Sequence, residues 1–257
     1  MTQDAWNPAQ YGRFHAERTQ PFLDLLALVH PRPGMRVVDL GCGTGELTRR
    51  LHLHLEARQT LGIDRSGAML EKSAAFVAEG LRFEAGDIAT FRARAAYDLV
   101  FSNAALHWVP DHEALLGRLV EALAPEGQLA VQVPANADQP AHVTAREVAA
   151  EPPFADALRD GPRADNVLAP EAYARLLFRL GFRAQHVRLQ VYGHLLGGRE
   201  DVVEWVKGTL LTSYAERLAP PLYAEFLARY AARLLPRLED THPFFFPFKR
   251  ILLWGRR

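Results

Sequence analysis

The chain has 257 residues, of which 49% are hydrophobic and 23% are charged. This composition is typical of a globular chain with enough apolar material for a large core, and it excludes intrinsic disorder as the main state. Thirty Lys and Arg residues balance thirty Asp and Glu residues. The sequence therefore lacks the broad positive field expected of a general nucleic-acid-binding protein.

A single cysteine, Cys42, excludes an internal disulfide framework and a structural zinc site built from several thiolates. The amino-terminal residues show no basic segment followed by an apolar one, and no stretch approaches the roughly 20 apolar residues that cross a bilayer. We therefore expect a cytoplasmic protein that has no membrane partner and binds no metal.

The first half of the chain alternates strand and helix patterns. A helix with an apolar face is predicted over residues 18–29, before the first strand. From Pro33 to Pro134, short β-branched runs alternate with helical periodicity, which indicates βαβ units and a parallel sheet. The predicted strands are 35–40, 60–64, 81–84, 97–102 and 128–133. The predicted helices between them are 46–54, a helix capped by Ser66 that runs to about Glu79, and one with an apolar stripe of Leu115, Leu116, Leu119, Val120 and Leu123.

The second half is less regular. Residues 135–170 and 199–243 are mostly helical in pattern, whereas residues 183–192 and 249–254 have strand patterns. We expect an α/β fold whose sheet is completed by these two late strands, with helices inserted as a lid. The chain is interpreted as one domain, 1–257. Its core is 30–134 with late strands at about 183–192 and 249–257, and its helical lid is about 1–29, 135–175 and 199–243.

The first strand leads into a glycine-rich turn, Asp39-Leu40-Gly41-Cys42-Gly43-Thr44-Gly45, before a helix. Three glycines let the backbone approach a ligand whose negative or polar groups meet helix N–H groups, so the turn predicts a nucleotide-like ligand. The dinucleotide fingerprint requires glycine where Glu46 stands, and a carboxylate there would repel a pyrophosphate. NAD and FAD are therefore disfavoured. S-adenosylmethionine carries a sulfonium and an ammonium and tolerates nearby acids, and Asp39 is placed to meet that ammonium directly or through water.

Acids at the ends of the next two strands extend this interpretation. Asp64 lies 23 residues after Gly41, close to the roughly 20-residue interval at which an acid accepts the ribose hydroxyls in nucleotide-binding βαβ units. Asp87 follows the third strand and is placed to accept from the adenine amino group, with Ile88 against the ring. Each acid alone is equally well explained as a solvated carboxylate at a strand end. The glycine-rich turn, Asp64 and Asp87 together, in this order and at this spacing, favour a bound cofactor.

Other reactive side chains have simpler explanations. Cys42 sits between two glycines without an indicated His or Asn partner, which favours packing over nucleophilic catalysis. His52 and His54 are two apart on a helix and do not share a face, so surface histidines are favoured over metal ligands. The fourth strand ends in Ser102-Asn103-Ala104-Ala105-Leu106, which lacks the Asn-Pro-Pro-Tyr or Asp-Pro-Pro-Tyr pattern of base-amino methyltransferases. A nucleobase substrate is therefore disfavoured.

The cofactor segments resemble those of class I S-adenosylmethionine-dependent methyltransferases, and further segments resemble the trans-aconitate methyltransferase family. The resemblance to this family is carried by Trp6-Asn7-Pro8 with Tyr11, Phe14, Glu17-Arg18 and Pro21, by Phe101 to His112, by Ala130-Val131-Gln132-Val133-Pro134, by His142-Val143 with Arg146-Glu147-Val148-Ala149, by Trp205-Val206, and by Arg250 and Arg256-Arg257. It spans nearly the whole chain. Departures are concentrated in residues 151–166 and 210–247, so the substrate is less securely indicated than the chemistry.

The resemblance implies a Rossmann-like, doubly wound, seven-stranded sheet, mostly parallel with an antiparallel late strand. It also implies methyl transfer from S-adenosylmethionine to a carboxylate of trans-aconitate, giving a monomethyl ester and S-adenosylhomocysteine. A carboxylate is already a nucleophile at neutral pH, so no catalytic side chain is expected. The cofactor contacts carried over are Asp39, Gly41, Gly43, Gly45, Asp64, Asp87, Ile88 and Asn103, with Tyr11 and Trp6 closing over the cofactor.

Arginine forks are the best donors for the remaining carboxylates of such a substrate. The matching segments assign this role to Arg146 and Arg250, with Arg18, His107, Tyr192 and Trp205 as neighbours. Two alternatives stay open: a methyltransferase for another small acid or biosynthetic intermediate, which would differ only in the lid, and a cofactor-binding regulator without turnover. Turnover on a panel of carboxylic acids discriminates among them. The sequence does not indicate the oligomeric state.

Overall fold

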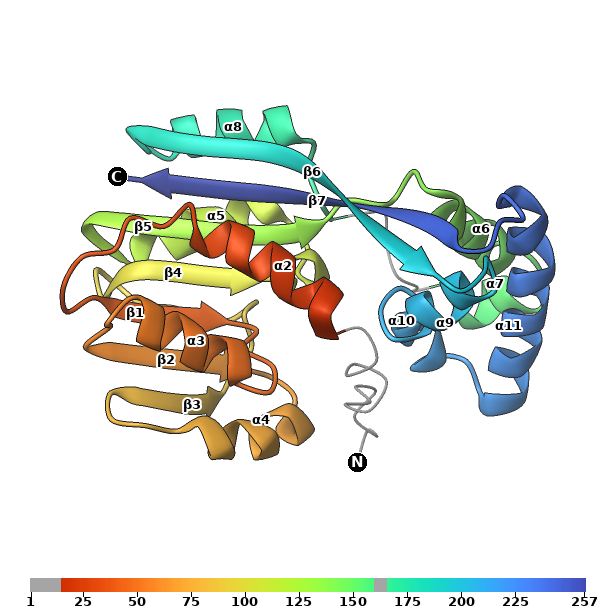
Figure 1. Cartoon of the computed structure of the whole chain (residues 1–257), viewed down its shortest axis with the longest axis horizontal. Coiled ribbons are helices and arrows are strands. Elements are labelled where there is room, and N and C mark those ends of the chain that lie inside the picture. Colours follow the sequence, from red (N-terminus) through yellow and green to blue (C-terminus); the bar gives the residue numbers. More distant parts are fainter. Residues whose placement is uncertain (1–14, 160–165) are drawn as a thin grey trace. The chain divides into compact units, whose positions relative to one another are not determined.

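The computed structural model describes residues 15–159 and 166–257 (Figure 1). The chain divides into two compact units. Among the described residues, the sheet unit comprises 15–135, 166–190 and 250–257. The helical unit comprises 136–159 and 191–249.

The strands of the described residues form one seven-stranded sheet in the order β3-β2-β1-β4-β5-β7-β6 (Figure 1). They are β1 (Arg36–Leu40), β2 (Gln59–Asp64), β3 (Leu81–Ala85), β4 (Tyr97–Asn103), β5 (Leu123–Pro134), β6 (Ala184–Leu196) and β7 (Phe244–Arg256). Strands β1 to β5 pair in parallel, and β7 pairs with β5 in the antiparallel sense. The predicted Rossmann-like sheet, mostly parallel with an antiparallel late strand, is confirmed. Because β1 to β5 are parallel, the residues that follow β1, β2, β3 and β4 meet at one edge of the sheet, its carboxyl edge.

Helices cover both faces of this sheet. They are α2 (His15–Leu26), α3 (Glu46–His54), α4 (Gly67–Ser73), α5 (His112–Glu121) and α8 (Pro170–Arg179), with 3-10 turns η1 (Ala74–Phe76) and η2 (Leu106–Trp108). Successive strand residues point to opposite faces. Val37 therefore packs in the cluster with α2 and α3, whereas Val38 packs in the cluster with α5 and α8. The helix at 15–26, assigned to the lid from its position in the sequence, thus contributes Phe22 and Leu25 to the core of the sheet unit.

Several element boundaries differ from the sequence-based expectation. Strand β7 begins at Phe244 rather than at 249 and β6 continues to Leu196 rather than to 192, and two further differences concern the ends of α4 and α5. Helix α4 ends at Ser73 rather than near Glu79, because a 3-10 turn follows and Gly80, with φ of 72°, reverses the chain into β3. Leu123 shares the buried stripe of α5, yet it is the first residue of β5 and pairs with Tyr97. A buried side chain there suits either backbone conformation, so the hydrophobic pattern did not locate the end of the helix.

The helical unit is built from α6 (Pro140–Ala149), α7 (Phe154–Ala157), α9 (Asp201–Lys207), α10 (Thr212–Ala215), α11 (Pro220–Leu234) and η3 (Leu235–Arg237), with the adjoining parts of β6 and β7. Its core is aromatic: the ring of Phe226 lies edge-on to Phe154 at 5.3 Å and stacks on Tyr214 at 4.9 Å between centroids. No helix within residues 15–159 or 166–257 combines the length and the apolar character needed to cross a membrane.

Candidate cofactor and substrate sites

The glycine-rich turn lies at the carboxyl edge of the sheet, between β1 and α3. The backbone N–H groups of Gly41 and Cys42 donate to the Ile63 carbonyl of β2 at 2.8 and 3.0 Å, which fixes the turn against its neighbouring strand. Gly41 has φ of 82°, and a Cβ there would lie 2.2 Å from the Cβ of Ala105. Only glycine allows this approach. A Cβ on Gly43 would meet no described atom within 4 Å, so there is open space beside its Cα.

Asp39 is a buried acid at the base of this turn. Its side chain is 4% exposed, and its Oδ2 accepts a hydrogen bond from the Thr48 hydroxyl of α3 at 2.6 Å. Burial raises the pKa of Asp39 to about 7, the Thr48 hydrogen bond opposes this rise, and the nearby charge of Asp64 adds to it. A cation bound in the turn would relieve the cost of ionising Asp39, as the predicted ammonium contact requires.

Asp64 ends β2 and holds two backbone groups. Its Oδ2 accepts from the Gly43 N–H at 2.8 Å, and its Oδ1 accepts from the Ser66 N–H at 2.9 Å. Asp64 therefore lies beside the glycine turn, as the sequence predicted, and is joined to it by a direct hydrogen bond. A carboxylate offers about four acceptor positions, so two remain for a ribose diol. Asp64 thus supports the turn, a role that the spacing alone did not show, and its ribose contact stays a prediction.

Asp87 and Ile88 follow β3 at the same edge. Asp87 is exposed, and its Oδ1 accepts from the Ala89 N–H at 2.8 Å. Ile88 is half-buried, and its Cδ1 lies 3.6 Å from the position that a Cβ on Gly41 would occupy. The structure therefore brings Ile88 to the glycine turn. The proposed adenine contacts of both residues stay predictions.

The loop after β4 contributes the fourth part of this edge. The Oδ1 atom of Asn103 is buried and has no hydrogen-bond partner among the residues that the structure describes. Ala104 has φ of 55°, a left-handed conformation that is unfavourable for a residue with a Cβ, and its N–H donates to the Gln132 carbonyl at 2.9 Å. Strained residues of this kind cluster at ligand sites.

Together these residues fit the cofactor predicted from the sequence. The turn leaves open space beside the Gly43 Cα, Asp39 and Asp64 offer carboxylates, and Asn103 offers an acceptor without a partner in the described chain. S-adenosylmethionine, with its ammonium, sulfonium and ribose hydroxyls, has the donors and positive charge that such acceptors require. Trp6 and Tyr11, predicted to close over it, lie outside the described residues, as does the side chain of Arg18.

The two arginines predicted to bind substrate lie in different units. Arg250 of β7 belongs to the sheet unit, is 6% exposed, and donates from Nη1 to Gln132 Oε1 at 3.3 Å. Arg146 of α6 belongs to the helical unit, is exposed, and donates from Nη2 to the Ala137 carbonyl at 2.7 Å. No carboxylate of the described residues pairs with Arg146, whereas Arg233 and Arg237 pair with Glu151 and Glu147.

Arg146 also influences its surroundings electrostatically. Burial is the larger cause and the positive charge of Arg146 the next in lowering the pKa of His142 to about 4. The Tyr214 hydroxyl faces the same charge, which partly offsets the rise in its pKa caused by burial. Arg146 thus presents positive charge within the helical unit, as an anion-binding residue would. Its substrate role stays a prediction.

The weaker substrate candidates have evident packing roles. Trp205 is 2% exposed and stacks on His194 at 4.6 Å, and Phe246 lies edge-on to it at 5.8 Å. Tyr192 is buried on β6 in the same unit. His107 lies in η2, half-buried, with its ring 4.6 Å from that of Trp108. Their contacts with substrate stay predictions.

Two simpler interpretations from the sequence have different outcomes. Cys42 is buried, and burial, followed by the charges of Asp39 and Asp64, raises the pKa of its thiol. A protonated, buried thiol is a packing group. The expectation that His52 lies on the surface is wrong: it is 8% exposed, and its Nδ1 is 2.9 Å from the Thr60 hydroxyl of β2.

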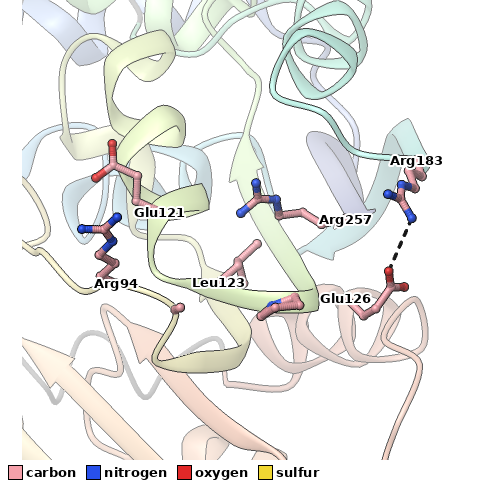
Figure 2. A pocket seen from close by; sticks show the side chains of 8 residues that line it. Arg94, Glu121, Leu123, Glu126, Arg183 and Arg257 are labelled. Carbon is pink, nitrogen blue, oxygen red and sulfur yellow. Dashed lines mark ion pairs between the residues drawn. The ribbon is translucent and has the colours of Figure 1, made fainter.

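A cavity of about 740 Å³ lies near the amino end of β5, away from the carboxyl edge of the sheet (Figure 2). It is lined by Glu121 at the end of α5, by Leu123, Pro125 and Glu126 at the start of β5, and by Arg94, Ala95, Arg183 and Arg257. Glu126 and Arg183 form an ion pair of 3.6 Å across exposed side chains (Figure 2). None of the predicted cofactor or substrate residues lines this cavity, so it is not the predicted active site.

Comparison with known proteins identifies the class and then the family. Residues 31–169 match the family model described as a methyltransferase domain. With the sheet and the glycine turn, this defines an enzyme class, the S-adenosylmethionine-dependent methyltransferases. The chain is 43% identical to the trans-aconitate 2-methyltransferase of Deinococcus radiodurans, over 98% of each chain. It is 41% identical to that of Variovorax paradoxus, over 98% of this chain and 95% of the relative. The chain belongs to the trans-aconitate 2-methyltransferase family.

A solved structure supports the fold alone. The YcgJ protein of Bacillus subtilis aligns with a TM-score of 0.60 and 13% identity, over 93% of this chain and 98% of that one. The predictions of family, enzyme class and cofactor are confirmed. The residue-level assignments stay predictions. The sequence analysis did not single out Gln132, a buried polar residue of β5 whose Oε1 accepts a hydrogen bond from Arg250.

Proposed function

We propose that this protein transfers the methyl group of S-adenosylmethionine to a carboxylate of trans-aconitate, giving a monomethyl ester and S-adenosylhomocysteine. The observation that carries the proposal is the match to trans-aconitate 2-methyltransferases over 98% of the chain. This match includes the helical unit. Arg250, buried at the carboxyl edge of the sheet, supplies a cation suited to a polycarboxylate.

Methyl transfer to a carboxylate requires mainly that the protein position the cofactor and the acceptor oxygen. Bound S-adenosylmethionine supplies an electrophilic methyl group on a sulfonium. The substrate carboxylate is already anionic at neutral pH, so no side chain has to remove a proton. The rate then depends on holding the acceptor oxygen in line with the methyl group, and such positioning contributes up to about 7–11 kcal/mol.

We assign the positioning to two sets of residues. Asp39, Asp64, Asp87, Asn103 and the glycine turn hold the cofactor, with Ile88 against its adenine. Arg250 and Arg146 bind the carboxylates that are not methylated, because guanidinium forks match carboxylates in geometry and charge. We further propose a cytoplasmic location and a small-molecule partner without nucleic acid, supported by the single cysteine and the balanced charge.

Methylation of another small acid is the second candidate. It is favoured by the departures from the family pattern at residues 151–166 and 210–247, most of which lie in the helical unit. A panel of di- and tricarboxylates, assayed by mass spectrometry for gain of one methyl group, decides between the two. If the protein binds cofactor but methylates no acid in the panel, it is not a carboxyl methyltransferase, and a regulator without turnover is favoured.

The dependence of rate on pH tests the carboxylate itself. A carboxyl group with a pKa of about 4 is fully ionised above about pH 6, so kcat should be flat from about pH 6.5 to 9 with both substrates saturating. An amine or phenol, with a pKa of about 10, would instead give a rate rising about tenfold per pH unit. A rise that disappears in His107→Ala would show a general base and contradict carboxylate methylation.

A further inference from the structure

Two fully buried glutamines on β5, Gln128 and Gln132, differ in how their amides are satisfied. Both are 0% exposed, and they lie four residues apart, on the same face of the strand. Gln128 has every group satisfied: its Oε1 accepts from the His30 N–H at 2.8 Å and from the Trp254 indole at 2.9 Å, and its Nε2 donates to the His30 carbonyl at 2.7 Å. Gln128 is therefore a structural residue.

Gln132 is satisfied only on its oxygen. Its Oε1 accepts from Arg250 Nη1 at 3.3 Å, and its Nε2 is buried with no hydrogen-bond partner among residues 15–159 and 166–257. The assignment of the two amide atoms is fixed by chemistry, because a guanidinium can only donate and must face the oxygen. A buried amide donor without an acceptor is costly, so its retention needs an explanation.

The position of Gln132 indicates the kind of group that would accept a hydrogen bond from its Nε2. The order of strands places the glycine turn after β1, then Asn103 at the end of β4, then Gln132 on β5 and Arg250 on β7. Asn103 and Gln132 are register partners. The acceptor without a described partner, Asn103 Oδ1, thus lies toward the cofactor side, and two donors, Gln132 Nε2 and the Arg250 guanidinium, lie beyond it.

We infer that Gln132 is a substrate-binding residue whose Oε1 holds the Arg250 guanidinium and whose Nε2 donates to the carboxylate that Arg250 binds. The inference rests on the proposed function and adds a residue to it. An amide N–H and a guanidinium side by side match the two oxygens of one carboxylate. Gln132 would then select acids that place a second carboxylate beside Arg250 during methyl transfer.

Substitution by glutamate separates this role from a structural one. Gln132→Glu keeps an oxygen facing Arg250 and adds an ion pair, so the fold should lose no stability. It also removes the N–H donor and places a negative charge against the substrate. We expect the KM for trans-aconitate to rise about 10- to 100-fold, while the Kd for S-adenosylmethionine, measured by calorimetry, stays within about twofold. Gln132→Met, which removes both contacts, should raise KM at least as much.

Gln128→Met is the matched control, because it removes the satisfied amide on the same face of the same strand. It should lower the melting temperature and leave KM unchanged. If wild-type protein methylates trans-aconitate and Gln132→Glu has a wild-type KM, the inference is wrong while the proposed function stands. If wild-type protein methylates no acid of the panel, the proposed function fails, and this role of Gln132 fails with it.

Discussion

Neutralising the buried Asp39 should stabilise the cofactor-free protein in a pH-dependent way. Burial raises the pKa of Asp39 from 3.8 to about 7. Each pKa unit corresponds to about 1.4 kcal/mol, so ionised Asp39 costs the folded state up to about 4 kcal/mol. Asp39→Asn removes the charge and keeps an oxygen that accepts the hydrogen bond from Thr48.

The sign follows from proton binding. Between about pH 4 and 7, folded Asp39 keeps a proton that the unfolded chain has released, so this group's contribution to stability is full below about pH 4 and is lost as the pH rises through 7. The free energy of unfolding of Asp39→Asn should therefore equal that of wild type near pH 4 and exceed it by up to about 4 kcal/mol at pH 8.

Urea unfolding of both proteins at four pH values between 5 and 8, without cofactor, measures this difference. Taking the difference between the two proteins cancels other titrating groups such as His142, which is unchanged in the variant. Cofactor affinity should move the opposite way: the wild-type Kd should fall as pH rises toward 7, and Asp39→Asn should bind weakly at every pH. Parallel stability curves for the two proteins would refute the assignment of a raised pKa to Asp39.

Four further substitutions test other parts of the site. Asp64→Ala should weaken S-adenosylmethionine binding by at least tenfold in calorimetry, because charge-assisted hydrogen bonds of about 1.5–3 kcal/mol each are lost; an unchanged Kd would remove Asp64 from the ribose contact. Arg146→Gln and Arg250→Gln should each raise the KM for trans-aconitate about tenfold or more with cofactor affinity retained, and lysine should recover little; wild-type kinetics in both would move the anion site elsewhere. Gly41→Ala should cost at least about 2 kcal/mol in urea unfolding, since the new Cβ would overlap Ala105 at positive φ. If Gly41→Ala were as stable as wild type, the loop after β4 must move to accommodate the new Cβ.

Local patterns in the sequence determined the elements around the cofactor. The helix predicted over 46–54 is α3, and each of the five predicted strands has its counterpart within a few residues. The glycine turn and Asp64 also lie where the βαβ spacing placed them, joined by the Gly43 hydrogen bond. These features depend on residues close together in the chain, so turn chemistry and periodicity were enough to predict them.

Tertiary structure alone decided which distant side chains meet and which polar groups stay unsatisfied. Arg250 and Gln132 are 118 residues apart and become neighbours only because β7 returns antiparallel beside β5. His52 is likewise buried where α3 packs against β2, with its Nδ1 2.9 Å from the Thr60 hydroxyl. A sequence pattern records which residues are polar. It does not record whether a buried amide finds a partner, because that depends on the pairing of strands from opposite ends of the chain.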